Sequence, residues 1–299
     1  MGSVYACLLA AAGHGVTAVD LDAEHVEAIR VGGLRVEGAS GDRIVSIAAT
    51  TRAADVGAVE LVVIATKAMH ARAAAESAGP LLGGETTVLT IQNGLGAADT
   101  VADVVGEERL LVGVAGGFGA SLVAPGHAHH HGMELVHLGE PNGPVTPRCE
   151  LIADVWRSAG FTVRTYDDVS RLLWEKLICN ACYAGVCGLL QLTIGEVIES
   201  PHAWSTASRC AQETLDVGRA RGVRLEIDDA AAYVREYGLK ITGARPSLLL
   251  DLLAGRPTEV EWINGSVPRE GAEVGVLAPV NELVTTLVLA KQATALRRR

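Results

Sequence analysis

Residues 1–20 read MGSVYACLLAAAGHGVTAVD, and this stretch decides the fold of the first half of the chain. It leads from Gly2 through an apolar helical segment to a short β-branched strand, and Asp20 follows that strand directly. A mononucleotide-binding fold opens with a strand and Gly-x-Gly-x-x-Gly, and an acidic residue about 20 positions on takes the ribose hydroxyls. Because Asp20 lies 18 residues past Gly2, we interpret Gly2 as the third glycine of this fingerprint. We expect the first strand and the two earlier glycines upstream of Met1.

Two other interpretations of the same residues stay open. In the first, Gly2 is an ordinary N-terminal residue, and Asp20 caps a helix that starts near Ala23. Alternatively, the chain is a truncated, non-catalytic paralogue, because losing a central strand removes part of the backbone nest that holds a phosphate.

Up to residue 166, short β-branched runs alternate with amphipathic helical segments, which is typical of βαβ units and a parallel sheet. The predicted strands are 16–19, 61–65, 87–91, 110–114 and 134–138. The predicted helices are 4–12, 24–31, 69–78, 97–105 and 149–159. We therefore predict an α/β, Rossmann-like dinucleotide-binding domain over residues 1–166, with its first strand missing.

From residue 167 onward the strand signal disappears. Apolar-periodic segments follow, from 169–190 to 280–295, and their periodicity predicts helices. The predicted breaks are at Gly195, Pro201, Gly222 and the Gly255-Arg256-Pro257 turn. Residues 167–299 should form an all-helical substrate and catalytic domain.

The composition limits the partners and the compartment. A net charge of −10 argues against a nucleic-acid surface. No apolar stretch is long enough to span a bilayer. A signal peptide needs a positively charged start, but no Lys or Arg precedes Arg30. Six scattered cysteines suit small core residues in a reducing compartment. We expect a cytoplasmic protein without membrane or nucleic-acid partners.

Two clusters invite a metal interpretation. Cys179 and Cys182 form Cys-x-x-Cys, yet no second pair stands at zinc-like spacing. His127, His129 and His131 would share one face of an extended segment and bind zinc if a fourth position were open. We favour a surface loop that enters the last strand of the first domain, and we expect no metal.

Four motifs follow one another along the chain. They are Ala65-Thr66-Lys67-Ala68, Ile91-Gln92-Asn93-Gly94-Leu95-Gly96, Trp174-Glu175-Lys176-Leu177-Ile178-Cys179-Asn180, and Arg245-Pro246-Ser247 with Gly255-Arg256-Pro257-Thr258-Glu259. Ile263-Asn264-Gly265 and Ala278-Pro279-Val280-Asn281 come after them. In order and spacing, over nearly the whole chain, they resemble the ketopantoate reductase family. The resemblance implies a helical domain of the 6-phosphogluconate dehydrogenase C-terminal-like type, NADP(H) as cofactor, a small 2-keto acid substrate, a place in pantothenate biosynthesis, and a homodimer.

Reduction of a 2-keto acid needs a hydride donor, an acid for the nascent alkoxide and groups that hold the carboxylate. Lys176 is the candidate acid, because an ammonium on an interior helix can hydrogen-bond the carbonyl and then donate its proton. Asn180 lies four residues on, on the same helix face. The resemblance makes these two the proton donor and a substrate ligand. It also makes Ser247 a substrate contact and Glu259 a catalytic and cofactor-side group that pairs with Lys176.

Lys67 and Asn93 stand at the carboxyl ends of predicted strands, the edge where open α/β sheets bind ligands. The resemblance places both in the cofactor and reaction cleft, with Asn93 also on the substrate. In the loop Gly116-Gly117-Phe118-Gly119, it implies that Gly119 lets its backbone approach the dinucleotide.

Each of these residues has an ordinary structural alternative. In these alternatives, Lys176 only extends along an amphipathic helix, and Asn180 hydrogen-bonds a neighbouring backbone group. Glu259 would stabilise a helix N-terminus, and Lys67 and Asn93 would be ordinary loop residues.

The chain also departs from the family pattern. Ala184 and Ile194 stand where substrate-binding asparagines are usual, so the substrate is expected to be ketopantoate or a bulkier, less hydroxylated relative. The family generally places an Arg after the second strand to meet the 2′-phosphate of NADPH. Here Asp20-Leu21-Asp22 occupies that place, and a carboxylate repels a phosphate. We therefore predict a preference for NAD(H).

A second enzyme interpretation is a β-hydroxyacid dehydrogenase, which shares the N-terminal fold and a Lys-x-x-x-Asn on a helix. The segment from Arg245 to Glu259 favours the reductase.

Overall fold

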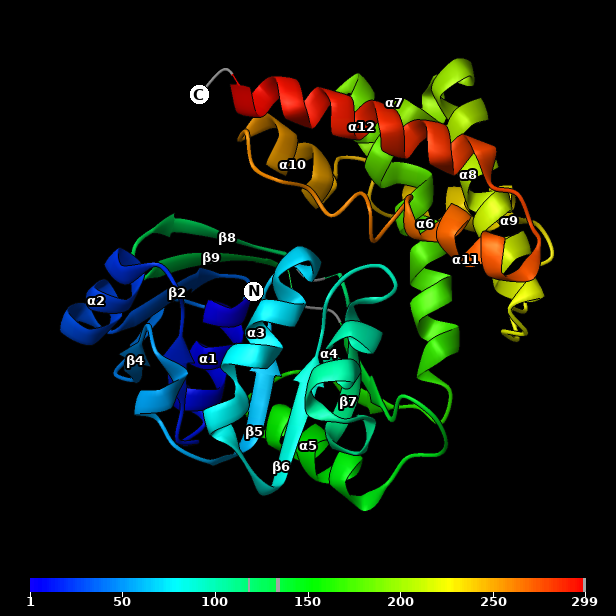
Figure 1. Ribbon diagram of the computed structural model, residues 1–299. Helices are drawn as coiled ribbons and strands as arrows, with labels where there is room; N and C mark the ends of the chain where they lie inside the picture. Colours follow the sequence, from blue (N-terminus) through cyan, green and yellow to red (C-terminus); the bar gives the residue numbers. More distant parts are fainter. Residues whose placement is uncertain (118, 133–134, 298–299) are drawn as a thin grey trace. The chain divides into compact units, whose positions relative to one another are not determined.

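The computed structural model describes residues 1–117, 119–132 and 135–297. The chain divides into two compact units (Figure 1): unit 1 comprises residues 1–92 and 97–169, and unit 2 comprises residues 93–96 and 170–299. Each unit has its own apolar core. In the part of the chain that the structure describes, no helix is long and apolar enough to cross a membrane.

The main sheet of unit 1 has the strand order β11-β10-β7-β6-β5. Its strands are β5 (Val59–Ile64), β6 (Leu82–Thr90), β7 (Leu110–Gly116), β10 (Leu135–Gly139) and β11 (Val163–Thr165). β5, β6 and β7 are parallel, whereas β10 runs antiparallel to β7 and parallel to β11. The last five residues of β6 are all buried, as expected of a parallel strand covered on both faces. The predicted α/β fold is confirmed.

The described residues of unit 1 contain five α-helices, and these match the predicted segments closely. They are α1 (Gly2–Ala11), α2 (Ala23–Gly32), α3 (Ala71–Ser77), α4 (Ala97–Val105) and α5 (Pro147–Ser158). α1 buries Tyr5, whose ring lies 4.9 Å from that of Trp156 on α5. α1 is thereby anchored in the core, although it opens the chain.

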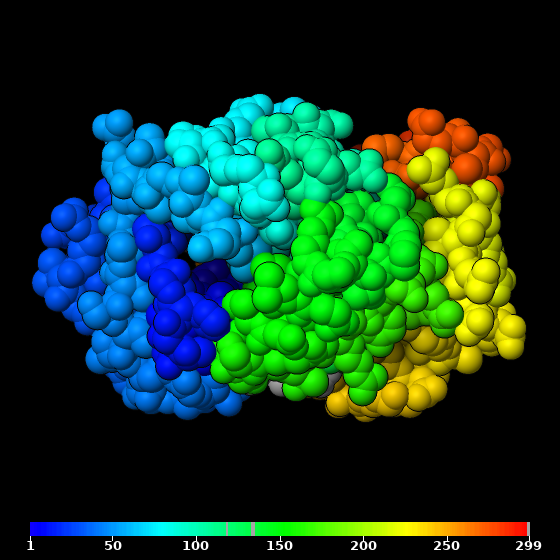
Figure 2. Space-filling model, turned by 90° about the horizontal axis from the view of Figure 1, so that it is seen from below, coloured from blue at the N-terminus to red at the C-terminus, as the bar shows by residue number. Residues whose placement is uncertain are grey.

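The strand that precedes Asp20 stands apart from the main sheet. β1 (Thr17–Val19) pairs in parallel with β4 (Ala48–Thr50), and these two strands form a sheet of their own. Among the described residues no ladder joins β1 to β5, so each of the two strands keeps an unpaired edge. Figure 2 shows a hollow beside the dark blue N-terminal segment, between it and the neighbouring light blue and green segments.

A third sheet of unit 1 contains the histidine-rich stretch and corrects its prediction. The strand order is β3 (Arg43–Val45), β2 (Leu34–Gly38), β9 (His127–Gly132), β8 (Gly119–Ala124). The predicted histidine loop was wrong: these residues are strand β9, parallel to β2 and antiparallel to β8. Burial of Ala128 and His130 alternates with half-buried neighbours, which is the period of a strand. Because histidine does not favour strands strongly, the composition of this segment did not predict strand β9.

Every α-helix or β-strand in the described residues of unit 2 is a helix, as predicted for this half of the chain. Its helices are α6 (Val169–Leu190), α7 (Ile194–Glu199), α8 (Pro201–Ala220), α9 (Ala230–Leu239), α10 (Ser247–Leu253), α11 (Ser266–Val274) and α12 (Pro279–Arg297). The bounds of α6 equal the predicted ones, and its residues form much of the core of the unit.

The predicted break at Gly195 was wrong, because Gly195 lies inside α7. The helix starts with a capping box, in which Thr193 Oγ1 accepts from Glu196 N and the Glu196 carboxylate accepts from Thr193 N. Such a box supports a helix start even with glycine in the first turn. A Cβ on Gly195 would lie 2.9 Å from Thr242 Cβ, so the glycine permits close packing here.

Candidate functional site

The candidate acid and its partner lie together in unit 2. Lys176 stands on α6 and is partly buried, whereas Glu259 lies in the turn segment between α10 and α11 and is only 8% exposed. Burial lowers the pKa of the Lys176 amine from 10.5 to about 8, and the negative charge of Glu259 opposes this shift. A partly desolvated amine under the influence of a carboxylate has the properties of a proton donor that works near neutral pH.

The loop after β6 joins this pair. Asn93 Nδ2 donates to Glu259 Oε2 at 3.3 Å, and Leu95 N donates to Trp262 O at 2.9 Å. Gly94 has φ +81°, and a Cβ there would lie 1.9 Å from Trp262 O. Only glycine fits this close approach. The structure thus brings together three predicted site residues: Lys176, Glu259 and Asn93.

Two other predicted residues of unit 2 remain without a contact that tests them. Asn180 is on α6 and partly buried, and Ser247 is exposed at the first position of α10. Among the described residues, no hydrogen bond links either one to Lys176 or Glu259. Their assignment to the substrate therefore stays a prediction.

The two positions that depart from the family pattern are both apolar and buried. Ala184 on α6 and Ile194 at the start of α7 are each 4% exposed and belong to the core of unit 2. Their side chains offer no polar atom to a ligand.

In unit 1, the predicted cofactor residues lie at a helix start and a strand end. Gly2 is the first residue of α1, whose N-terminus has no side-chain cap. Asp20 is exposed directly after β1, and its carboxylate accepts a hydrogen bond from Asp22 N at 2.9 Å. Asp22, not Asp20, caps α2, by accepting from the backbone of Glu24 and His25. The capping interpretation of Asp20 was therefore wrong.

The remaining predicted residues follow β5 and β7. Lys67 lies just past β5, in the loop whose Thr66 carbonyl accepts from Gln92 Nε2 at 3.2 Å. The same amide donates to Ile64 O at 2.6 Å, so Gln92 ties the ends of β5 and β6 together. Gly119 opens strand β8 instead of lying in a loop, and Phe118 of the predicted loop lies outside the described residues.

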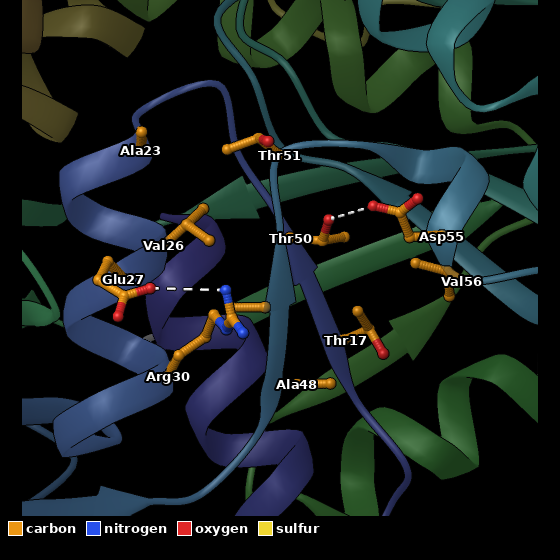
Figure 3. A pocket seen from close by; sticks show the side chains of 11 residues that line it. Thr17, Ala23, Val26, Glu27, Arg30, Ala48, Thr50, Thr51, Asp55 and Val56 are labelled. Atoms are coloured by element: carbon orange, nitrogen blue, oxygen red, sulfur yellow. Dashed lines mark hydrogen bonds and ion pairs between the residues drawn. The ribbon is translucent and has the colours of Figure 1, made fainter.

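A pocket of about 680 Å³ lies in unit 1 between α2 and strand β4 (Figure 3). Glu27 and Arg30 line it from α2, and Thr50 lines it from β4, with its hydroxyl 3.1 Å from the Asp55 carboxylate. The sequence did not predict this pocket. None of the predicted site residues lines it.

The histidine strand and the thiols show no metal arrangement. His127 and His129 each face the carboxylate of Glu37 on β2, at 3.3 and 3.5 Å, and the ring of His131 lies 4.7 Å from that of His129. No three His, Cys, Asp or Glu within residues 1–117, 119–132 and 135–297 are grouped to hold a metal ion. All six cysteines are free and buried, and burial raises the pKa of the Cys179 thiol to about 12.

Comparison with known proteins identifies the family to which this two-unit fold belongs. The family model described as ketopantoate reductase PanE/ApbA matches residues 1–143, and its C-terminal counterpart matches residues 168–292. The 2-dehydropantoate 2-reductase of Archaeoglobus fulgidus is 30% identical over 288 residues, covering 96% of this chain and 93% of that protein.

Solved structures show the same similarity. A PanE/ApbA family ketopantoate reductase from Ralstonia eutropha JMP134 has a TM-score of 0.89 at 30% identity, over 97% of this chain and 95% of that one. D-mandelate dehydrogenase with NADH and anilino(oxo)acetate has a TM-score of 0.91 at 25% identity, over 99% and 96% of the two chains. The two family models together span most of the sequence, and the chain belongs to the ketopantoate reductase family of NAD(P)-dependent oxidoreductases.

Proposed function

We propose that this enzyme reduces a 2-keto acid to the 2-hydroxy acid, with Lys176 as the proton donor. One observation carries the proposal: the amine of Lys176 is desolvated and its pKa responds to the charge of the buried Glu259 carboxylate, to which Asn93 donates a hydrogen bond. This arrangement supports Lys176 as the acid that protonates the oxygen when a ketone is reduced.

The roles follow from the charges. A bound nicotinamide dinucleotide supplies the hydride. Protonated Lys176 hydrogen-bonds the carbonyl oxygen and transfers its proton as negative charge develops there. The charge of Glu259 favours the ammonium form of Lys176, so the amine remains protonated before negative charge develops on the substrate oxygen. A pKa of about 8 suits this exchange, because the ideal acid has a pKa near the working pH.

The residues of unit 1 fit the dinucleotide. The first-turn N–H groups of α1 have no side-chain cap, and such groups bind phosphate oxygens. Exposed Asp20 after β1 suits the ribose hydroxyls of NAD(H) and repels the 2′-phosphate of NADP(H). Gly2, Lys67 and Gly119 belong to the proposed cofactor set as well. We therefore propose NAD(H) as the preferred cofactor, and the structural relative solved with NADH supports this.

The substrate is ketopantoate or a related 2-keto acid with a bulkier apolar group. Ketopantoate is favoured because the relatives are 2-dehydropantoate 2-reductases. The apolar replacements Ala184 and Ile194, and a relative solved with anilino(oxo)acetate, support acceptance of a larger group. Asn180, Ser247 and Asn93 are the proposed substrate ligands.

Location and assembly belong to the same proposal. Six free thiols support a reducing, cytoplasmic location. Exposed Leu283 and Leu287, one helical turn apart on α12, support a homodimer. Sedimentation of wild type and a Leu283→Lys, Leu287→Lys variant tests the assembly.

Substitution of Lys176 by Ala tests the central claim. We expect kcat to fall by about 10² to 10⁴, because general acid catalysis is lost, while the calorimetric Kd of NADH stays within about twofold. Lys240→Ala is the matched control, since that lysine is exposed at the C-cap of α9 and pairs with Glu236 one turn earlier. If Lys176→Ala keeps its kcat, or loses NADH binding to the same degree, the proposed role is wrong.

A further inference from the structure

The segment that carries Glu259 has no regular secondary structure to hold it. Between α10 and α11, residues 256–259 are irregular and residues 260–265 form turns, with local hydrogen bonds such as Trp262 N to Glu259 O at 3.0 Å. A buried carboxylate on an irregular segment needs outside contacts to keep its place relative to a partner on another helix. Two amide side chains supply such contacts, one on each side of Glu259.

Asn264 links the segment to the helix of Lys176. It is 0% exposed, and its Nδ2 donates to Ala181 O on α6 at 2.9 Å and to Asn281 Oδ1 at 2.9 Å. Gly185 makes the approach feasible, because a Cβ there would lie 2.9 Å from Asn264 Oδ1. Asn264 therefore fixes the turn segment against α6, one helical turn or so beyond Lys176.

Asn281 is itself immobilised, so it offers Asn264 a fixed acceptor. Its Nδ2 donates to Cys210 O at 3.0 Å and to Glu213 Oε2 at 2.9 Å. The Glu213 carboxylate also accepts the backbone N–H groups of Val280 and Asn281 at the start of α12, both at 2.9 Å. Both donors of the Asn281 amide are thus used, and its oxygen must face Asn264.

Gln292 holds the other side. Its Oε1 accepts from Thr258 N at 2.7 Å and from Thr258 Oγ1 at 2.8 Å. Thr258 is the residue immediately before Glu259, and it is buried. The acceptor stands on α12, the same helix whose first turn contains Asn281. The segment is therefore anchored to one rigid element at both of its ends.

We propose that Asn264 and Gln292 are positioning residues of the reductase site, which set the distance between the Glu259 carboxylate and the Lys176 amine without touching the substrate. The inference rests on the proposed function, since it concerns how the proposed acid is tuned. Neither residue belongs to the ligand set that the sequence motifs imply. Together they explain how an irregular turn can hold a charge opposite α6.

Asn264→Leu and Gln292→Met test the proposal, with Tyr183→Phe as control. Tyr183 lies on α6 and donates a buried hydrogen bond to Val234 O at 2.7 Å, so the control removes an equivalent bond unrelated to Glu259. We expect each test variant to lower kcat by about 10- to 100-fold, because small misplacements in an active site have effects of this order. The alkaline limb of the kcat profile should move to lower pH, and the Kd of NADH should stay unchanged. Tyr183→Phe should leave the limb in place.

A double-mutant cycle decides whether the effect passes through Glu259. In a Glu259→Gln background, Asn264→Leu should cause no further shift of the limb, because the carboxylate that it positions is gone. A full shift in that background, or an equal shift in Tyr183→Phe, overturns the proposal. If Asn264→Leu does not fold, Gln292→Met on the half-buried face of α12 decides, and an unchanged profile there overturns it as well.

An NMR titration of the Lys176 amine separates this inference from the proposed function. If Lys176→Ala remains active, the proposed function fails, yet the amine should still titrate at lower pH in Asn264→Leu than in wild type. An identical titration in both proteins overturns the positioning role whatever the activity shows.

Discussion

At the scale of single residues, the site depends on two opposing effects on one amine. Burial favours the neutral form of Lys176, and the Glu259 carboxylate favours the charged form. The result, a pKa of about 8, lies close enough to neutrality for proton transfer in either direction. A small displacement of Glu259 alters this balance, and the change is measurable as a pH profile.

Glu259→Gln isolates the contribution of the carboxylate. The substitution removes the charge that raises the pKa of Lys176, so the amine should lose its proton at lower pH. Because the proposed mechanism uses the acid form of Lys176, the alkaline limb of kcat should move to lower pH, and kcat at pH 9 should fall on the order of tenfold. Steady-state rates between pH 6 and 10 measure this. A limb that moves upward would contradict the assigned sign.

Asp20 should govern the choice of cofactor. We expect kcat/KM with NADH to exceed that with NADPH by about tenfold or more, because a carboxylate opposes the 2′-phosphate. Asp20→Asn should reduce this ratio, whereas the exposed Glu85→Gln should leave it unchanged. Initial rates with both cofactors give the answer, and a large NADPH advantage in wild type would refute the role of Asp20.

At the scale of elements, the loop of residues 93–96 shows how a short segment constrains the site. Gly94→Ala places a side chain where φ is +81° and where Cβ would lie 1.9 Å from Trp262 O. We expect a loss of about 3 kcal/mol or more in the free energy of unfolding, together with a fall in kcat as Asn93 shifts.

Gly143→Ala is the matched control for this loop. Its φ is +100°, but nothing lies within 4 Å of the added Cβ, so it incurs the backbone strain alone, about 1–2 kcal/mol. Urea unfolding gives the loss of unfolding free energy for both variants. The difference between the two losses is the cost of the steric clash at Gly94 beyond backbone strain. Equal losses would show that Gly94 has no packing role.

Elements that the sequence predicted well are those with many apolar contacts of one period. α6 is 22 residues long and was predicted to the residue, because long periodic segments leave little ambiguity. The missed strands are short or atypical, among them β4 with the sequence Ala-Ala-Thr and the histidine strand β9. Their pairing partners, not their own propensities, make them strands.

The site divides in the same way. Motifs identified Lys176, Glu259 and Asn93 far apart in the sequence, and the fold brings them together. Gln292 has no motif around it, because its role comes only from reaching Thr258 across the helical unit. A contact that tertiary packing alone creates leaves no local signal.

At the scale of the whole molecule, the tuned amine should weaken the fold. The folded-state pKa of Lys176, about 8, lies below the 10.5 of an ordinary lysine. Below pH 8 both states carry the proton, and its desolvation costs folding up to about 3 kcal/mol relative to the neutral amine. Between pH 8 and 10.5 the folded protein releases the proton first, so stability rises with pH.

Comparison with Lys176→Met measures this cost. The variant should be more stable than wild type below pH 8, and the difference should shrink as the pH rises towards 10.5. Urea unfolding at pH 7, 8, 9 and 10 gives the four differences. A difference that does not change with pH would show that the amine is not desolvated in the folded protein.

Because every cysteine is buried, the rate at which the thiols react reports how often the protein opens around them. Cys7 and Cys149 lie in unit 1, and the other four thiols lie in unit 2. Since buried, protonated sulfur does not react, an alkylating reagent can modify each half only while that half is open. Mass spectrometry of the alkylated protein therefore shows which unit opens first: two adducts indicate unit 1, and four adducts indicate unit 2. No engineered label is needed.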